Sequence, residues 1–392
     1  MASIKPLDEV LDLAVASGRV AGVVAMVAAA DRVLYRHAAG QREICRPGVM
    51  SIDTVFWVAS MTKVITTVAA LQLVERGLLQ LDSPLVPLVP ALREAAVLEG
   101  FDSQGQPRLR APKRPITLRH LLAHTAGFGY DMWSEALRRY ADRVEMPPLT
   151  ACRRELLRAP LLFDPGDRWQ YGINHEWVGQ AVEAAAGRPL DEVLEQDVFV
   201  PLDMRSTGFE LRPPLRARLA AMHCRAADGG LQTLPLELPY PPEVFLGGAG
   251  LYSTAPDFVT FMQVLLNDGC HRGRPFLRSR TVRSMLSNQI GAHEIPAMRS
   301  TAPALTTDLE FFPDAAPKWG FGVMINTQDV PGGRRAGSAG WAGLGNTYFW
   351  IDARSGIAAV ILMQLLPFGD RLALQVCRDF EQSLYAALAA LK

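Results

Sequence analysis

The chain has 392 residues, of which 49% are hydrophobic and 20% charged, and this globular composition argues against long disordered stretches. Lysine plus arginine and aspartate plus glutamate are equal at 40 each, so no overall field favours nucleic acid or an anionic membrane surface. A small molecule is therefore the expected partner, and the length predicts one large mixed domain or two interleaved domains.

The five cysteines are odd in number, widely spaced and without a CxxC pair, so they predict neither a disulfide framework nor a zinc site. This usage fits a reducing compartment, and we expect a cytoplasmic protein with no metal and no cofactor. Since no apolar run approaches the roughly 18 residues of a membrane span, no membrane association is expected. The sequence does not predict the oligomeric state.

The N-terminal segment predicts a helix followed by a hairpin. Apolar residues recur at helical spacing between residues 7 and 14, and Gly18 follows as a stop signal. The apolar run 21–30, the pair Asp31-Arg32 and the segment VLYRHA then predict two strands. The run could instead be the apolar part of an export signal, but acidic residues precede it where a signal peptide is basic, so we interpret it as a buried strand.

The middle of the chain reads as helices separated by long connections, among them residues 100–116 and 234–250. Connections of this length are expected to form walls of a site. Near the C-terminus, NTYFWID and GIAAVILMQ predict another strand pair around ARSG, and a helix is expected from about Asp370. The fold class is therefore α/β (α+β), with a sheet domain of residues 1–58 and 320–392 and a mostly helical inserted domain of residues 59–319.

A serine and a lysine lie three residues apart in VFWVASMTKVITTVAALQLVERG, residues 55–77. If residues 60–76 form a helix that ends at Gly77, Ser60 and Lys63 lie on one face and their side chains can meet. A serine hydroxyl needs a base, and a lysine can act as one when apolar flanks or nearby positive charge lower its pKa. The helix N-terminus would favour an oxyanion at the serine. This motif alone is weak, because serine and lysine three apart also occur by chance in helices.

Two further segments accompany the motif. Tyr171 follows an Asp-Pro-Gly loop and could share a proton relay with Lys63, although a lone tyrosine is more commonly a core residue with a satisfied hydroxyl. The segment SAGWAGLGNTYFW brings small residues to the start of a strand, where the backbone can offer an N–H to a ligand, or where they simply form a turn.

Taken together and in this order, the motifs resemble the serine β-lactamase and penicillin-binding-protein superfamily. The chain looks most like the family VIII bacterial carboxylesterases, which share the class C β-lactamase fold. That resemblance implies an antiparallel sheet flanked by helices with a mostly helical insertion. The segments that carry it are SMTK at 60–63, LRHLLAHTAGFGY at 118–130, PGDRWQYG at 165–172, GGAGLYSTAPDF at 247–258 and GWAGLGN at 340–346.

The resemblance also implies roles for individual residues. Ser60 would be acylated, Lys63 would deprotonate it, and Tyr171 would shuttle the proton to the leaving group and from water. The backbone N–H groups of Ser60 and Leu344 would form the oxyanion hole. Three further residues are expected at the substrate: Tyr130, Trp341 and Gly343.

The sequence departs from the class C pattern at two places. An asparagine follows Tyr171 one position late, as Asn174, so an amide contact to substrate is doubtful. The lactamase Lys-Thr-Gly is replaced by Trp341-Ala342-Gly343, as the esterases tend to have it.

Other residues are expected to be bystanders or pocket walls. Ser338 lies in AGSAG, which lacks the first glycine of a nucleophile elbow, and His124 and His175 are read as structural histidines. Some aromatic residues are expected to line an acyl pocket, while others will be core: Trp57, Phe128, Trp133, Phe245 and Trp341.

The sequence therefore predicts a serine carboxylesterase that hydrolyses short-chain carboxylic esters through an acyl-enzyme. Two enzyme alternatives stay open, a β-lactamase and an acyltransferase that passes the acyl group to an alcohol. An alternative of another class is a penicillin-recognising binding protein that acylates without turnover.

Overall fold

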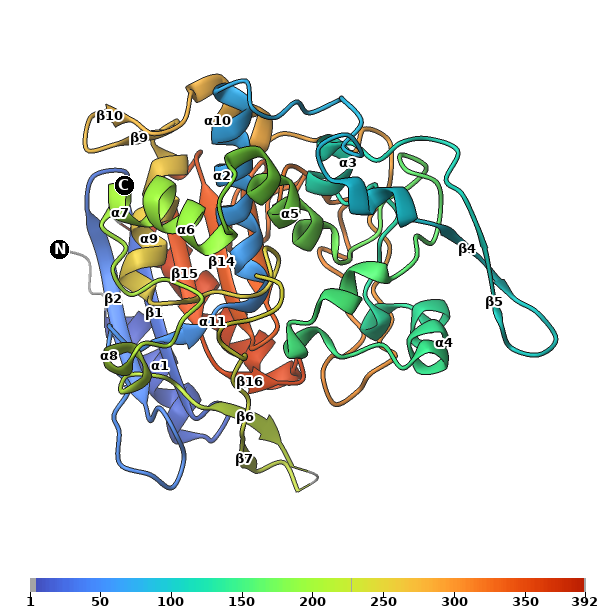
Figure 1. The fold of residues 1–392 in the computed structure, drawn as a ribbon. Helices are drawn as coiled ribbons and strands as arrows, with labels where there is room; N and C mark the ends of the chain where they lie inside the picture. The colour runs from blue at the N-terminus through green and yellow to red at the C-terminus, as the bar shows by residue number, and fades with distance from the viewer. Residues whose placement is uncertain (1–4, 227, 391–392) are drawn as a thin grey trace.

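A seven-stranded antiparallel sheet lies at the centre of the computed structural model, which describes residues 5–226 and 228–390 (Figure 1). The N-terminal hairpin joins the C-terminal strands because β1 pairs with β15. The expected sheet built from both ends of the chain is confirmed. In spatial order its strands are β11 (Lys318–Trp319), β12 (Met324–Ile325), β13 (Ala339–Gly343), β14 (Thr347–Asp352), β15 (Ile357–Leu362), β1 (Gly22–Ala28) and β2 (Val33–Gly40).

Helices cover both faces of this sheet. Successive residues of a strand point to opposite faces, and on β14 the ring of Phe349 contacts Phe258 of α9 (Ala255–Leu266), whereas Trp350 contacts Phe380 of α11 (Arg371–Ala389). The opening helix α1 (Lys5–Ala16) packs against α11. Every residue of β1, β14 and β15 is consequently buried, which explains why these strands read as apolar runs without alternation.

The helix α2 (Thr62–Glu75) runs between the sheet and the helix α5 (Asn174–Ala186). It is buried on all sides from its first residue to Leu73, so its sequence shows no polar stripe. It begins two residues later than predicted, after the 3₁₀ turn η1 (Ala59–Met61). The other α-helices are α3 (Leu118–Leu122), α4 (Glu135–Val144), α6 (Leu190–Leu194), α7 (Val200–Leu202), α8 (Pro213–Arg216) and α10 (Ser279–Met285).

The two long connections behave differently. Residues 100–116 do not line the pocket described below; most of them belong to the hairpin of β4 (Val97–Phe101) and β5 (Pro107–Arg110), which projects from the body (Figure 1). The expected wall is wrong there, because the segment has enough extended residues to pair with itself. Residues 234–250 do reach the pocket, through Ala249. Small sheets use the remaining strands: β3 (Phe56–Trp57), β6 (Met222–Arg225), β7 (Leu231–Leu234), β8 (Tyr252–Ser253), β9 (Cys270–His271), β10 (Arg274–Pro275) and β16 (Leu365–Leu366).

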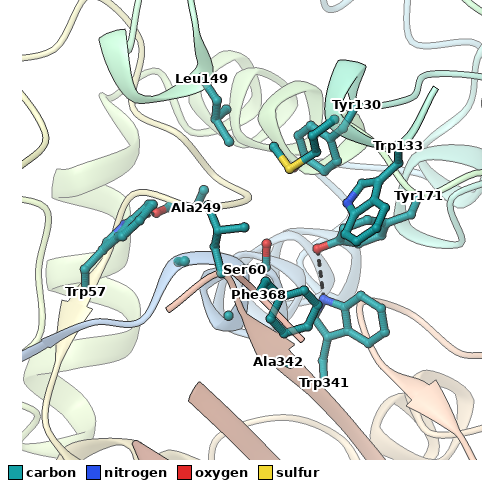
Figure 2. A pocket seen from close by; sticks show the side chains of 14 residues that line it. Trp57, Ser60, Tyr130, Trp133, Leu149, Tyr171, Ala249, Trp341, Ala342 and Phe368 are labelled. Atoms are coloured by element: carbon teal, nitrogen blue, oxygen red, sulfur yellow. Dashed lines mark hydrogen bonds between the residues drawn. The ribbon is translucent and has the colours of Figure 1, made fainter. Parts of the chain in front are cut away.

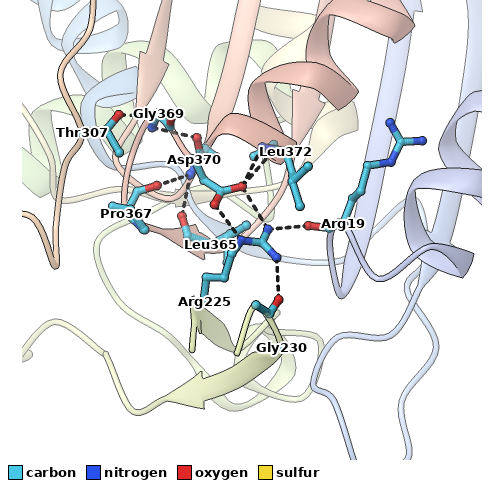
Figure 3. A network of polar contacts seen from close by, with 12 residues as sticks. Arg19, Arg225, Gly230, Thr307, Leu365, Pro367, Gly369, Asp370 and Leu372 are labelled. Carbon is cyan, nitrogen blue, oxygen red and sulfur yellow. Dashed lines mark hydrogen bonds and ion pairs between the residues drawn. The ribbon is translucent and has the colours of Figure 1, made fainter. Parts of the chain in front are cut away.

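A buried ion pair connects the inserted region to both ends of the chain. Arg225 on β6 donates from two nitrogens to the carboxylate of Asp370 at 2.7 and 2.9 Å, and also to the carbonyl of Arg19 at 2.8 Å (Figure 3). The same carboxylate caps α11 by accepting from the backbone N–H groups of Leu372 and Ala373. Since a buried carboxylate needs such partners, the pair fixes where α11 begins.

Two features bear on the compartment. All five cysteines are free. Within residues 5–226 and 228–390, every helix is too short or too polar to cross a bilayer. The boundaries expected for the two domains stay a prediction.

Candidate active site

Ser60 lies in the turn η1, directly before α2, and its side chain points into a pocket (Figure 2). The preceding residue, Ala59, has φ of +44°, a left-handed conformation that is unfavourable for a residue with a Cβ. The surroundings maintain it, because Ala59 is buried and the N–H of Val58 donates to the carbonyl of Leu251 at 3.0 Å. A strained backbone therefore presents the Ser60 hydroxyl to the pocket.

Lys63 is completely buried beneath Ser60, and its Nζ has three hydrogen-bond partners. Its Nζ lies 3.1 Å from Ser60 Oγ, 3.2 Å from the hydroxyl of Tyr130 and 2.9 Å from the carbonyl oxygen of Gly248. The structure thus brings the predicted nucleophile and the predicted base into hydrogen-bond contact. An amine at this distance can accept the proton of the serine.

Tyr130, rather than Tyr171, supplies the phenol that is hydrogen-bonded to Lys63. The Tyr130 hydroxyl also donates to Glu176 Oε1 at 3.4 Å. Burial raises the pKa of Tyr130 well above its usual value, and the nearby Glu176 carboxylate raises it further. Tyr130 is therefore a neutral phenol over the physiological range, a hydrogen-bond relay and not a phenolate base.

Tyr171 contacts Lys63 through its ring. The Nζ of Lys63 lies 4.8 Å from the ring centroid, and the hydroxyl accepts a hydrogen bond from the indole N–H of Trp341 at 2.9 Å. Figure 2 shows this bond and shows the Tyr171 hydroxyl directed into the same space as Ser60 Oγ. The indole N–H is consequently used inside the protein, and Trp341 presents its apolar surface to a ligand.

The end of β13 forms another wall beside Ser60, and the expected oxyanion-hole residue Leu344 lines the pocket there. A Cβ on Gly343 would lie 2.3 Å from the carbonyl oxygen of Val58. Glycine is therefore required at this position for the strand to approach the turn that carries Ser60. The role of the Ser60 and Leu344 N–H groups as an oxyanion hole stays a prediction.

The pocket around Ser60 is apolar, with about 420 Å³ of space including its mouth. Three of the aromatic residues expected there line it, Trp57, Trp133 and Trp341, whereas Phe128 stacks on Trp177 and Phe245 packs on Phe209. None of the lining residues carries a charged side chain. The sequence analysis missed Met132, although it lies between the expected residues Tyr130 and Trp133, and it missed Leu149 and Phe368, which lie outside every motif.

The remaining candidates lie outside the pocket. Ser338 donates to the carbonyl of Arg335 at 2.7 Å, and the Asn174 amide bonds to His124 Nδ1 at 2.8 Å and to the carbonyl of Phe128 at 3.3 Å. His175 Nε2 bonds to Thr67 Oγ1 at 3.0 Å. Asn174, His124 and His175 thus serve the packing between α2, α5 and the segment after α3, whereas Ser338 bonds within the segment before β13.

Comparisons with known proteins show what the chain is similar to. A family model described as Beta-lactamase matches residues 7–376. Monacolin J acid methylbutanoyltransferase from Aspergillus terreus is 31% identical, over 95% of this chain and 93% of its own length, and lovastatin esterase from Penicillium rubens is 31% identical, over 98% and 99%. A solved structure of a simvastatin synthase mutant from Aspergillus terreus aligns with a TM-score of 0.84 at 30% identity, covering 100% of this chain and 98% of the other.

Proposed function

The chain belongs to the beta-lactamase family, and we propose that it is a serine carboxylesterase that hydrolyses short-chain esters through an acyl-enzyme on Ser60. The superfamily and the fold predicted from the motifs are confirmed; the finer assignment to the family VIII carboxylesterases is part of the proposal. The observation that carries it is the contact between Ser60 Oγ and the buried Lys63 Nζ at the floor of an apolar pocket.

In the proposed first step, Lys63 takes the proton of Ser60 while the serine oxygen attacks the ester carbonyl. The backbone N–H groups of Ser60 and Leu344 would stabilise the oxyanion. When the C–O bond breaks, the departing alkoxide takes a proton through Tyr171, which Lys63 replenishes. Water then attacks the acyl-enzyme and passes a proton through Tyr171 to Lys63. The acyl C–O bond to Ser60 breaks, Lys63 returns that proton to the serine oxygen, and the acid leaves.

An acyltransferase is a second candidate, and a specific observation favours it. One relative is named a methylbutanoyltransferase and another an esterase, and both are 31% identical to this chain. The two reactions share the acyl-enzyme and differ in whether an alcohol or water accepts the acyl group.

As part of the proposal, the five free cysteines support a cytoplasmic location.

A panel of nitrophenyl esters, with and without added alcohols, tests both candidates. We expect nitrophenol release with stoichiometric free acid, and a fluorophosphonate adduct on Ser60 by peptide mass spectrometry. Ser60→Ala should abolish turnover in a folded protein, while Ser338→Ala should retain it. Ester formed in place of acid at low alcohol concentration would establish the acyltransferase, and an adduct on Ser338 would overturn the assignment.

A further inference from the structure

Glu176 is a completely buried carboxyl group close to the Ser60–Lys63 pair, and the mechanism above does not use it. It lies in the first turn of α5, where Oε1 accepts from Tyr130 and Oε2 has no hydrogen-bond partner among the residues that the structure describes. A carboxyl group without full hydrogen bonding is costly to bury, so its retention here calls for a compensating role.

The backbone makes room for this carboxyl. A Cβ built on Gly248 would lie 2.6 Å from Glu176 Oε2, so any larger residue at 248 would displace it. The carbonyl of the same Gly248 accepts from Lys63 Nζ. Glu176 and Lys63 therefore meet at two shared groups, the Gly248 backbone and the Tyr130 hydroxyl.

Several titratable groups face this carboxyl from the surrounding elements. Lys63 comes from α2, and Tyr130 and Cys152 come from the segments before η3 (Asp131–Trp133) and after η4 (Leu149–Ala151). Tyr171, from the segment before α5, lies against Lys63 and not against this carboxyl. His175 is the neighbour of Glu176 on α5. Burial raises the pKa of Glu176, while the positive charge of Lys63 lowers it. Lys63 is thus the cation to which this acid responds.

We propose that Glu176 is a positioning residue that, through Tyr130, stabilises the ammonium formed when Lys63 takes the serine proton. This inference rests on the proposed function. In that step the Ser60 O–H bond breaks and an N–H bond forms on Lys63, so a positive charge arises on a completely buried side chain. A carboxylate across the Tyr130 hydroxyl offsets this charge and orients the phenol that holds Nζ.

Glu176→Gln tests the role, because it keeps the shape and an acceptor for Tyr130 but removes the charge. Without the carboxylate the ammonium is less favoured, so the acid limb of kcat/KM for a neutral nitrophenyl ester should move to lower pH by about one unit. The plateau should fall by up to about 10-fold, since the lysine is a weaker base. Glu176→Asp should restore part of both changes. Glu183→Gln, two turns along α5, is the matched control and should leave the profile unchanged.

A loss of rate with the acid limb at its wild-type pH would show a merely structural role and overturn the proposal, as would an unchanged profile. If Glu176→Gln does not fold, Tyr130→Phe removes the hydroxyl between the two groups and should shift the limb in the same direction; an unshifted limb there also overturns it. The wild-type enzyme separates the two hypotheses. Failure of Ser60 to label or of the ester to turn over rejects the proposed function, whereas a labelled, active enzyme with an unshifted variant rejects this inference alone.

Discussion

At the scale of single residues, the two tyrosines beside Lys63 have different tasks. The Tyr130 hydroxyl is engaged by both Lys63 and Glu176, and burial keeps it protonated. The Tyr171 oxygen accepts only the Trp341 indole among the bonds described for it, and its hydroxyl faces the pocket. In the proposed mechanism, Tyr171 accordingly exchanges a proton with the leaving group, while Tyr130 holds Lys63 in place.

The Trp341 indole N–H is expected to contribute to catalysis through Tyr171. Trp341→Phe removes the donor but keeps an aromatic wall, and a neutral hydrogen bond is worth about 1 kcal/mol, so kcat should fall about 5-fold with KM little changed. Steady-state kinetics on nitrophenyl butyrate measure this. Trp133→Phe is the control, because it also replaces an indole ring of this pocket with a smaller phenyl ring. Equal losses in both variants would show that ring area, and not the N–H, is responsible.

The sequence predicts the Ser60–Lys63 contact because spacing along one short turn and helix determines it. It does not predict that Tyr130 takes the Lys63 hydrogen bond, since that depends on how the segment after α3 lies across α2. Glu176 was missed as well; the signal that could have identified it is an acidic residue five positions after Tyr171, in a segment, residues 169–182, with no other Asp, Glu, Lys or Arg.

At the scale of elements, α2 and α5 enclose two neutral histidines. His124 and His175 are both completely buried, with ring centroids 5.0 Å apart. Burial lowers the pKa of each well below its usual value, and the positive charge of Lys63 lowers both further. Each ring also has one nitrogen without a hydrogen-bond partner. The interface therefore tolerates imidazole and opposes imidazolium.

This interface predicts instability in acid. Above pH of about 6.5 the two histidines are neutral in both states; below it the unfolded chain binds protons that the folded chain does not, so stability falls as pH drops. Each such histidine adds a slope of about 1.4 kcal/mol per pH unit. We expect the free energy of unfolding, measured with urea between pH 7 and 5, to depend less steeply on pH in His175→Gln than in the wild type. The difference in slope should approach the contribution of one histidine, about 1.4 kcal/mol per pH unit.

Thr67→Val is the matched control, because it removes the hydroxyl bonded to His175 and keeps both histidines. It should lower stability while leaving the slope in place. A slope that persists unchanged in His175→Gln would mean that the acid sensitivity arises elsewhere.

Element prediction succeeded where one physical signal dominated. Continuous apolar runs identified β1 and β15, and helical periodicity identified α1 and α11. It failed for residues 100–116, whose pairing as β4 and β5 has no apolar alternation, since most of the hairpin faces solvent.

At the scale of the whole molecule, the pocket exists only in the folded chain. Trp57 from β3, Leu149 from η4, Trp341 from β13 and Phe368 after β16 meet around Ser60, as Figure 2 shows. Their separations along the chain exceed any local pattern, which is why the motifs located the chemistry but not the full lining. Because the numbers of acidic and basic residues are equal, no net charge of the protein selects among substrates, and substrate specificity depends on the residues that line the pocket.

The absence of charge among the pocket-lining residues predicts discrimination against anionic substrates. The carboxylate of benzylpenicillin would be left without a cationic partner in a partly dry site, at a cost of about 1–3 kcal/mol, while neutral nitrophenyl esters lose nothing and gain apolar contact. We expect kcat/KM for nitrophenyl acetate and butyrate to exceed that for benzylpenicillin by at least about 10-fold. The methyl ester of benzylpenicillin is the matched substrate, and it should react faster than the free acid.

Trp341→Lys extends this argument to the protein. A lysine there offers a charge-assisted donor to the carboxylate of benzylpenicillin, which should raise kcat/KM for the penicillin. It also removes the apolar wall and the bond to Tyr171, which should lower kcat/KM for the esters. The difference in kcat/KM between the two substrates should therefore become smaller. Initial rates on the same four substrates test this expectation. If the wild-type protein cleaves benzylpenicillin as fast as nitrophenyl butyrate, charge at this wall does not govern selection, and the β-lactamase alternative replaces the esterase.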